Sequence, residues 1–299
     1  MKHYSSVKTV NRESGLLWHG DTLPTRLLLT SFRAIPYFRG KGLLFRWITS
    51  LFFDKELRLS SNWGMRLNIY PNDFIGHAIA FEGGYEPRSL ALAARIMSNG
   101  GVFVDVGCNF GLYTLSMAGI PGVQCIAIDA SFVALAKLNE NLKRNPGINA
   151  AIVSCALTTT NAVQCFEVPS QWNLGMTRVA DMETQKNPSR FWAAGVPLQQ
   201  VLARLAPGRI RLLKIDVEGF ELSVFRGLDF EGPFRPDNLI VECDPEGFRN
   251  APACFEFLIS KGYEAMSIEG KVVQDCRELP EKNVWFRCAS NEQPSTKCE

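Results

Sequence analysis

The chain has 299 residues, of which 46% are hydrophobic and 21% are charged, and its formal net charge at pH 7 is +2. This composition can build a sizeable core and excludes a disordered chain. The small net charge and the lack of any block of five or more basic residues argue against nucleic acid as a partner.

The N-terminal segment, the apolar stretches and the cysteines indicate the cellular location of the protein. The N-terminal segment MKHYSSVKTVNRESG lacks the apolar core of a signal peptide. No stretch approaches the roughly 18 uncharged apolar residues that a membrane-spanning helix needs. The nine cysteines are odd in number and contain no Cys-x-x-Cys pair, which favours free thiols over disulfides or a structural zinc site. We therefore expect a cytoplasmic protein.

The first 70 residues are predicted to form a helical accessory region. Apolar residues alternate there with Arg26, Arg33, Arg39 and Arg46, and Pro36, Gly40 and Gly42 interrupt the pattern. The pattern predicts two short amphipathic helices near 24–35 and 42–53. Three interpretations stay open: an arm packed on the main domain with solvated arginines, a basic element in peripheral contact with a membrane or partner through residues 24–53, and a dimerisation arm.

From about residue 100 the pattern alternates between buried strands and helices. Strands are expected at 101–108, 123–130, 148–157, 210–219 and 238–245, and helices at 109–119, 131–145, 197–208, 220–228 and 252–262. The segments 263–270 and 283–290 have no helix between them and should pair antiparallel at the end of the sheet, while 158–195 is predicted to be a hairpin or loop insertion. This order predicts a doubly wound α/β sheet that is mostly parallel.

Acidic residues end four of the five expected parallel strands. Ligands of such sheets bind beyond the carboxyl ends of the strands, near the point where the strand order reverses. Charges that serve only solubility would be scattered over helix faces instead, so this clustering indicates a functional site. The acids are Asp105, Asp129, Asp216, Glu218, Glu242 and Asp244.

The segment VDVGCNFG after the first of these strands indicates the kind of ligand. Gly107 and Gly111 surround a turn at which a ligand can approach backbone N–H groups. The spacing is neither that of a dinucleotide fold nor that of a phosphate-binding P-loop. Asp105 would repel phosphates and suits a cationic amine, while Asp129 could accept both hydroxyls of a ribose. With Asn109, these residues favour a nucleoside ligand such as S-adenosylmethionine.

Four segments together resemble the successive blocks of the FkbM-type methyltransferases: GGYEP (83–87), VFVDVGCNFGLYTLSMA (102–118), LLKIDVEGFELSVFRGL (212–228) and LIVECDP (239–245). The resemblance covers roughly residues 80–290, and KIDVEGFE is its most particular part. It implies a class I Rossmann-like sheet and a methyltransferase that uses S-adenosylmethionine to methylate hydroxyls of natural products, sugars or lipid-like metabolites. The implied division is an accessory region (1–70), the methyltransferase domain (71–290) and a flexible tail (291–299).

The resemblance also implies roles for single residues. The methionine end of the cofactor would be cradled by Asp105, Gly107, Asn109 and Gly111. Asp129 would hold the ribose, and Glu86 would approach from the lid side. The family usually has a Glu-Pro-Asn-like turn where this chain has IDAS. The segment CALTT offers no carboxylate, so adenine recognition would rely on backbone groups around Cys155 and Ala156.

The segment LLKIDVEGFE supplies the catalytic candidates. A hydroxyl must lose its proton as the new bond forms, either to a general base or with the help of a metal. Asp216 is the first candidate for base or substrate anchor. Lys214 lies on the same strand face and would pair with Asp216 or stabilise an alkoxide, unless it snorkels at the sheet surface. Glu218 shares this face unless it caps the following helix, and Glu221 is predicted to be structural.

Several alternatives stay open. A divalent ion held by Asp216, Glu218 and Glu242 would suit oxygen ligands but is not favoured, and zinc is not expected without a histidine nearby. His77 is interpreted as structural, and Trp172 and Met176 would line an acceptor pocket if the insertion folds over the crevice. Two alternatives to an active methyltransferase also stay open: a non-catalytic scaffold with a methyltransferase-like domain, and a nicotinamide-dependent oxidoreductase. Asp105 and the missing third glycine argue against the latter.

Overall fold

A computed structural model describes residues 16–36, 38–52, 56–70, 73–167, 178–179, 190–243, 250–278 and 282–289. The predicted tail at 291–299 and the side chains of Trp172, Met176 and Asp244 lie outside these ranges. No helix in the described part of the chain is both long enough and apolar enough to cross a membrane.

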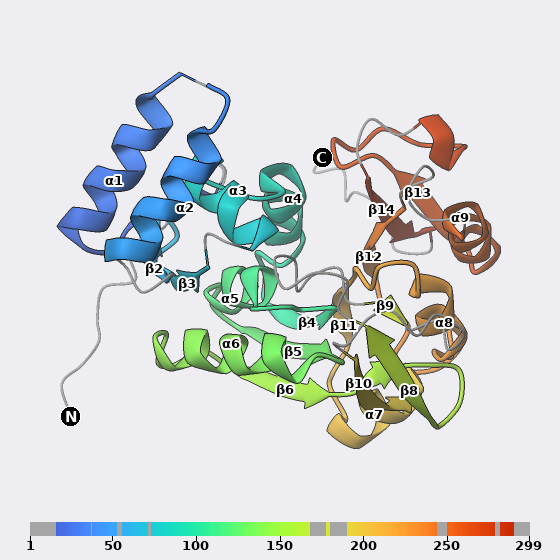
Figure 1. Ribbon diagram of the computed structural model, residues 1–299. Helices are drawn as coiled ribbons and strands as arrows, with labels where there is room; N and C mark the ends of the chain where they lie inside the picture. The colour runs from blue at the N-terminus through green and yellow to red at the C-terminus, as the bar shows by residue number, and fades with distance from the viewer. Residues whose placement is uncertain are drawn as a thin grey trace.

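A seven-stranded sheet forms the centre of the molecule (Figure 1). Its strands are β4 (Gly101–Val106), β5 (Val123–Asp129), β6 (Ala150–Ser154), β11 (Ile210–Ile215), β12 (Asn238–Glu242), β13 (Tyr263–Met266) and β14 (Asn283–Cys288). They are arranged in the order β13-β14-β12-β11-β4-β5-β6. β14 runs antiparallel to β12 and β13, whereas the other neighbouring pairs are parallel. This topology confirms the predicted doubly wound, mostly parallel sheet with an antiparallel last strand.

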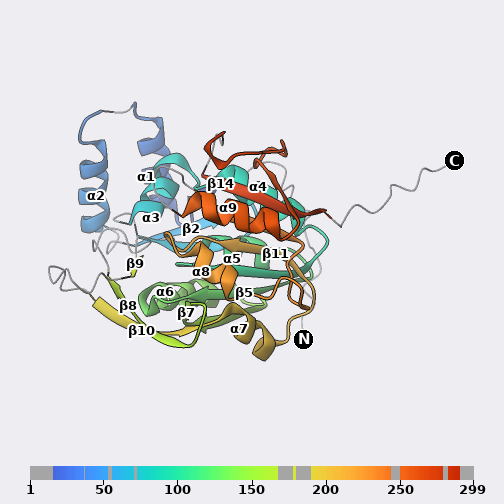
Figure 2. The same cartoon turned by 90° about the vertical axis from the view of Figure 1, so that its right-hand side faces the viewer.

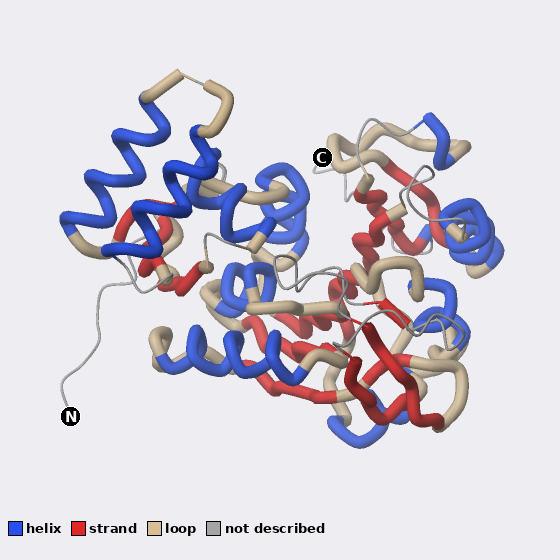
Figure 3. The backbone as a smooth tube through the Cα atoms, in the orientation of Figure 1, coloured by secondary structure: helices blue, strands red, loops and turns tan. Residues whose placement is uncertain are grey.

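Helices cover both faces of this sheet because successive strand residues point to opposite sides. Leu212 packs into one core, for example, and Leu213 and Ile215 pack into the other. One face carries α4 (Pro87–Ile96), α5 (Leu112–Ala118) and α6 (Phe132–Lys143), and the other carries α7 (Leu198–Leu205), α8 (Glu221–Arg226) and α9 (Ala251–Ser260). A short 3-10 helix spans Cys276–Glu278. In Figure 3 the red strands run between these blue helices.

The predicted insertion forms a second, smaller sheet. Its strands are β7 (Ala156–Leu157), β8 (Ala162–Glu167), β9 (Arg178–Val179) and β10 (Arg190–Val196), in the order β7-β10-β8-β9. β8 and β10 are antiparallel, so the expected hairpin is present. β7 directly follows β6, which places this sheet beside the edge of the main sheet where β4 and β5 end (Figure 1).

The N-terminal region contains the two predicted helices, α1 (Leu23–Ala34) and α2 (Lys41–Phe52). It also contains a three-stranded sheet that we did not predict, made of β1 (Trp18–Gly20), β2 (Leu57–Ser61) and β3 (Arg66–Ile69). Figures 1 and 2 both show α1 and α2 at one edge of the molecule, next to α3 (Phe74–Glu82). The domain boundary at residue 70 stays a prediction.

Aromatic rings and one arginine attach the helix pair to α3. The ring centroids of Phe32 and Phe45 are 4.9 Å apart, and those of Phe45 and Phe81 are 4.7 Å apart. The guanidinium of Arg33 donates hydrogen bonds of 2.9 Å to the carbonyl oxygens of Trp18, Ile79 and Ala80. The expectation that the arginines of this region are solvated is therefore wrong for Arg33, because its guanidinium satisfies carbonyl groups at the end of α3.

Candidate active site

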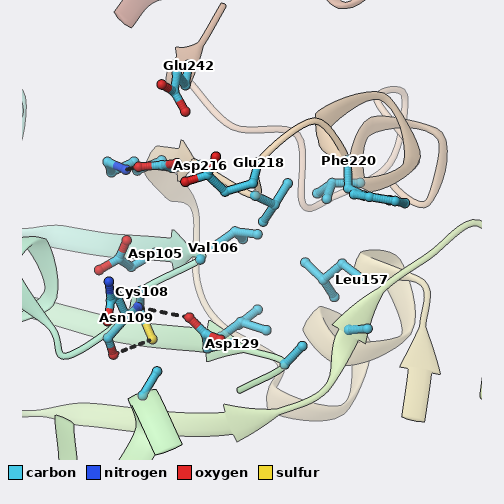
Figure 4. A pocket seen from close by; sticks show the side chains of 18 of the residues that line it. Asp105, Val106, Cys108, Asn109, Asp129, Leu157, Asp216, Glu218, Phe220 and Glu242 are labelled. Carbon is cyan, nitrogen blue, oxygen red and sulfur yellow. Dashed lines mark hydrogen bonds and ion pairs between the residues drawn. The ribbon is translucent and has the colours of Figure 1, made fainter. Parts of the chain in front are cut away.

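A cavity of about 790 Å³ lies at the carboxyl ends of β4, β5, β11 and β12, within the size range of small-molecule sites. Figure 4 shows Asp216, Glu218 and Glu242 on one wall and Asp105, Asn109 and Asp129 on the next. Six acids line the cavity: Glu86, Asp105, Asp129, Asp216, Glu218 and Glu242. Only two lysines, Lys214 and Lys282, line it in the described part of the chain.

The turn after β4 lines the cavity next to Asp105. Gly107 and Asn109 both line it and have positive φ angles of 76° and 49°. A side chain at Gly107 would clash with the carbonyl oxygen of Asp216, so the turn lies directly against the end of β11. Gly111 has a φ of 91°, and a side chain there would clash with Leu138 of α6. Gly111 thus faces α6 and is not among the residues that line the cavity.

Asp105 and Asp129 are both held by hydrogen bonds from neighbouring groups. The hydroxyl of Thr114 donates to Oδ2 of Asp105 over 2.6 Å. The backbone N–H of Asn109 donates to Oδ2 of Asp129 over 2.9 Å, and that of Ser131 donates to Oδ1 over 2.8 Å. Burial raises the pKa of Asp129 to about 6 even though these two N–H groups lower it. Each carboxylate oxygen still has a lone pair for a ligand.

The remaining predicted cofactor residues reach the cavity from distant segments. Ala156, together with Cys155, lines it from the junction of β6 and β7. Glu86 precedes α4 in the left-handed conformation, with a φ of 48°, and lines the opposite side. Its Oε2 accepts a 2.7 Å hydrogen bond from the hydroxyl of Tyr113. Burial raises the pKa of Glu86, an effect that Lys214 opposes.

Lys214 and Asp216 form an ion pair at the end of β11. Nζ of Lys214 donates to Oδ2 of Asp216 over 2.9 Å, and Lys214 is only 3% exposed. The alternative in which Lys214 snorkels at the sheet surface is therefore wrong. In the register of β11 and β4, Lys214 is paired with Asp105. Burial would lower the pKa of Lys214, but Asp216, Glu86 and Asp105 raise it above its usual value, so this lysine stays charged.

Asp216 also shares a hydrogen bond with Glu242, which comes from the neighbouring strand β12. Burial opposes ionisation of Asp216, but Lys214 and the hydrogen bonds from Lys214 and Glu242 lower its pKa below the usual value. Burial and the charge of Asp216 raise the pKa of Glu242 to about 9. Near pH 7, Glu242 therefore holds the shared proton and Asp216 is ionised.

The turn after Asp216 separates the roles of its two glutamates. Oε1 of Glu221 accepts hydrogen bonds from the N–H groups of Val217 and Gly219, at 3.3 and 3.1 Å. Glu221, and not Glu218, thus satisfies the turn before α8, so the helix-capping alternative for Glu218 is wrong. Glu218 lines the cavity, and burial together with Asp216 raises its pKa to about 7. Its backbone is left-handed, with a φ of 51°.

Backbone strain in the described residues is concentrated at the cavity. Among them, four residues other than glycine have positive φ angles: Glu86, Asn109, Ala206 and Glu218. All but Ala206 line the cavity. Such conformations cost about 1–3 kcal/mol each and gather at functional sites. The strain therefore indicates the same cavity as the acids do.

Sequence reasoning missed some residues of the cavity. Tyr113 and Thr114 supply the hydroxyls that bind Glu86 and Asp105, and a sequence signal existed because both fall in the first helical turn after the glycine-rich segment. Lys282 also lines the cavity, but no motif marks it. His77 stacks on Phe81 at 4.1 Å and does not line the cavity, which agrees with its structural interpretation.

The described part of the chain contains neither a disulfide among its described cysteines nor a cluster of metal ligands. The seven cysteines whose side chains the structure describes are buried, and none of them is in a disulfide. Among the described residues, no three side chains of His, Cys, Asp or Glu are grouped in a way that could hold a metal ion. Asp216 instead shares a hydrogen bond with Glu242 and accepts one from Lys214.

Comparison with known proteins places the chain among methyltransferases. The model of the methyltransferase FkbM domain matches residues 105–265, more than half of the chain. "Methyltransferase 1" of Beauveria bassiana is 29% identical over 185 residues, which cover 56% of this chain and 73% of that protein. "Methyltransferase sdnD" of Sordaria araneosa is 27% identical over 190 residues, which cover 54% and 73%.

Among solved structures, an O-methyltransferase from Bacillus cereus in complex with S-adenosylhomocysteine matches with a TM-score of 0.41 and 10% identity, covering 68% of this chain and 80% of that one. The match of the family model agrees with the segment resemblance and extends over the turn after β4 and over β11 and β12. The chain belongs to the FkbM family of methyltransferases, and S-adenosylmethionine is its expected cofactor.

Proposed function

We propose that this methyltransferase moves a methyl group from S-adenosylmethionine to a hydroxyl of a small-molecule, sugar or lipid-type acceptor. The observation that carries the proposal is a cluster of three acidic side chains, Asp216, Glu218 and Glu242. It lies beside the wall of the cavity that we assign to the cofactor. A hydroxyl must lose a proton during transfer, and a carboxylate whose pKa is near neutral is suited to accept it.

The wall that contains Asp105, Asn109 and Asp129 fits the cofactor. When bound, S-adenosylmethionine supplies a methyl group activated by a positively charged sulfonium. Six acids and two lysines line the cavity, which favours a cationic ligand over a phosphate. We assign Asp105, Gly107 and Asn109 to its methionine end and Asp129 to its ribose. Backbone groups at Ala156 would contact the adenine, and Glu86 would approach from the side of α4, whereas Gly111 would act by allowing α6 to pack against the turn.

Asp216 and Glu218 would divide the acceptor chemistry between them. Lys214 donates a hydrogen bond to Oδ2 of Asp216 and helps to lower its pKa below the usual value, so Asp216 would be a weak base that orients the acceptor hydroxyl. Glu218 has a pKa of about 7, and we propose it as the general base. Lys214 would keep Asp216 ionised, since the two charges lie 2.9 Å apart. These roles require no metal ion.

A labelled-methyl assay tests this function. Purified protein is incubated with S-adenosylmethionine carrying a labelled methyl group and a panel of alcohols, with matched amines and thiols of the same carbon skeletons as controls. We expect label in methyl ethers, identified by mass spectrometry, and a rate that rises with pH until about pH 7 as Glu218 loses its proton. Label in N-methyl or S-methyl products with none in ethers would contradict the proposal.

A further inference from the structure

The α1–α2 pair carries an unusual share of the exposed apolar surface. In the described part of the chain, nine of the nineteen large apolar side chains that are exposed lie between Leu23 and Phe52. Single exposed apolar residues are common on protein surfaces, but a contiguous group indicates an interaction site. This segment is about a tenth of the chain, so chance does not explain the concentration.

Helix α2 shows how this surface is arranged. Its buried residues are Lys41, Phe45 and Thr49, which recur every four positions and define the face toward the protein. Leu43, Trp47 and Leu51 also recur every four positions, and they are 64%, 61% and 57% exposed. Residues spaced in this way form one stripe along a helix, and this stripe lies opposite the buried one. Helix α2 therefore carries its apolar stripe on the face that points away from the protein.

The charge of the segment is one-sided. Residues 22–52 contain four arginines and one lysine and no aspartate or glutamate. Lys41 is occupied by the carbonyl oxygen of Ile35, and Arg33 by α3. Arg39 is exposed in the loop before α2, and Arg46 is half-buried on α2. An exposed apolar stripe on a segment whose charged residues are all basic is typical of helices that lie in the plane of an anionic membrane surface.

A second copy of the chain fits this surface less well. In a symmetric dimer the same patch meets itself, so the arginines of one copy would face those of the other without a single carboxylate in the segment to compensate them. Anionic lipid head groups offer the complementary charge, and Trp47 is of the residue type that prefers the boundary between head groups and acyl chains. Charge complementarity therefore selects the bilayer.

We propose that the outer face of α2, with the loop that precedes it, docks on an anionic lipid bilayer and holds the protein at the membrane surface. Leu43, Trp47 and Leu51 would enter the boundary between head groups and acyl chains, and Arg39 would contact lipid phosphates. The helix would lie on the surface, because its 12 residues fall short of the roughly 20 that a span requires.

Vesicle flotation tests the proposal with the full chain. We expect the protein to float with vesicles of equal parts phosphatidylcholine and phosphatidylglycerol and to stay unbound with phosphatidylcholine alone. Trp47→Ser should lower the partition coefficient about tenfold through lost apolar burial, and Arg39→Gln about fivefold. Trp192→Ser is the matched control, because Trp192 lies on β10 and is 60% exposed against 61% for Trp47; its partition coefficient should not change.

Three outcomes would overturn the proposal. The first is no flotation with the anionic vesicles, and the second is an equal loss in Trp47→Ser and Trp192→Ser. The third is a concentration-dependent dimer in sedimentation velocity that Trp47→Ser abolishes, which would assign the face to a second copy. Vesicle binding needs no methyl transfer, so this proposal and the proposed function fail separately. Circular dichroism of Trp47→Ser should match the wild type, because the side chain is exposed.

Discussion

The two walls of the cavity use the same residue types in different ways. After β4 and β5, Asp105 and Asp129 accept hydrogen bonds from a threonine hydroxyl and from backbone N–H groups. After β11 and β12, Asp216 and Glu242 are hydrogen-bonded to each other, and Lys214 forms an ion pair with Asp216. The first wall holds its acids in place through fixed donors, whereas the second couples several titrating groups.

This difference explains how one cavity can hold a cofactor and also move a proton. Fixed donors preorganise a binding wall without changing its charge during the reaction. Coupled acids exchange protons at pH values that depend on one another, so Glu218 reaches a pKa of about 7 while its neighbour Asp216 stays ionised. We therefore assign cofactor binding to the first wall and acceptor chemistry to the second.

The largest expected effect is that of Glu218→Gln on turnover. We predict that kcat for the acceptor found in the labelled-methyl assay falls about 1000-fold, because a general base contributes roughly 10²–10⁴ to the rate. The rise in rate toward pH 7 should disappear as well. Glu269→Gln, at an exposed ion pair with Arg88, is the control and should keep the wild-type kcat. A fall of less than tenfold in Glu218→Gln would assign the proton to another group.

Gly107→Ala tests how closely the two walls touch. The new side chain would clash with the carbonyl oxygen of Asp216 and would also sit at a φ of 76°. We expect a loss of about 4 kcal/mol in the free energy of unfolding, from overpacking plus backbone strain. Gly147→Ala is the matched control: its φ is 93°, but nothing lies within 4 Å of the added carbon. Denaturant titration should show a loss of only about 1 kcal/mol there; equal losses would mean that contact between the walls is unimportant.

The ion pair of the second wall can be tested through stability. Asp216→Asn leaves the buried charge of Lys214 without its partner, which should lower the free energy of unfolding by about 3 kcal/mol. The double variant Lys214→Met with Asp216→Asn removes both charges and should recover at least half of that loss. Denaturant titration of both variants measures the coupling. Additive losses would show that Lys214 draws its stability from other groups.

The sheet and the acids at its strand ends were predictable from the chain alone. Buried apolar runs such as Leu212–Ile215 are local signals, and the parity of Lys214 and Asp216 on one strand places them on the same face. The strands β2 and β3 carried a signal too, since Leu57, Leu59, Leu67 and Ile69 alternate around a turn at Gly64. The pattern around the nearby arginines predicted only helices in this region.

Pairings between distant segments were not predictable. The hydrogen bond from Tyr113 to Glu86 depends on the left-handed turn before α4, and that of Asp216 with Glu242 depends on β11 and β12 being neighbours. Arg33 reaches the end of α3, 46 residues away. No local pattern encodes such contacts, because packing of the whole chain brings these groups together.

The acids of the second wall should also make the stability of the protein depend on pH, and this effect should be smaller. In the folded protein the pKa values of Glu218 and Glu242 are about 7 and about 9, above the usual 4.5. Their contribution to stability is therefore fully present below pH 4.5 and is lost as pH rises through 7 and 9. We expect the free energy of unfolding to fall by about 1–2 kcal/mol between pH 6 and pH 9, and the Tm to fall with it.

Glu242→Gln keeps a neutral side chain at every pH, so its Tm should fall less than that of the wild type over the same range. Differential scanning calorimetry at matched ionic strength measures both proteins. Glu269→Gln serves again as the control at an exposed position and should lose as much as the wild type. A Tm of Glu242→Gln that falls as steeply would show that other groups cause the loss.

The division of labour between the walls is tested most directly by calorimetric titration with S-adenosylhomocysteine at pH 8. We predict one site in the wild type, about tenfold weaker binding in Asp129→Asn, which loses a carboxylate acceptor for the ribose, and an affinity within about twofold of the wild type in Glu218→Gln. No binding to the wild type, or a weakening confined to Glu218→Gln, would contradict this assignment of the two walls.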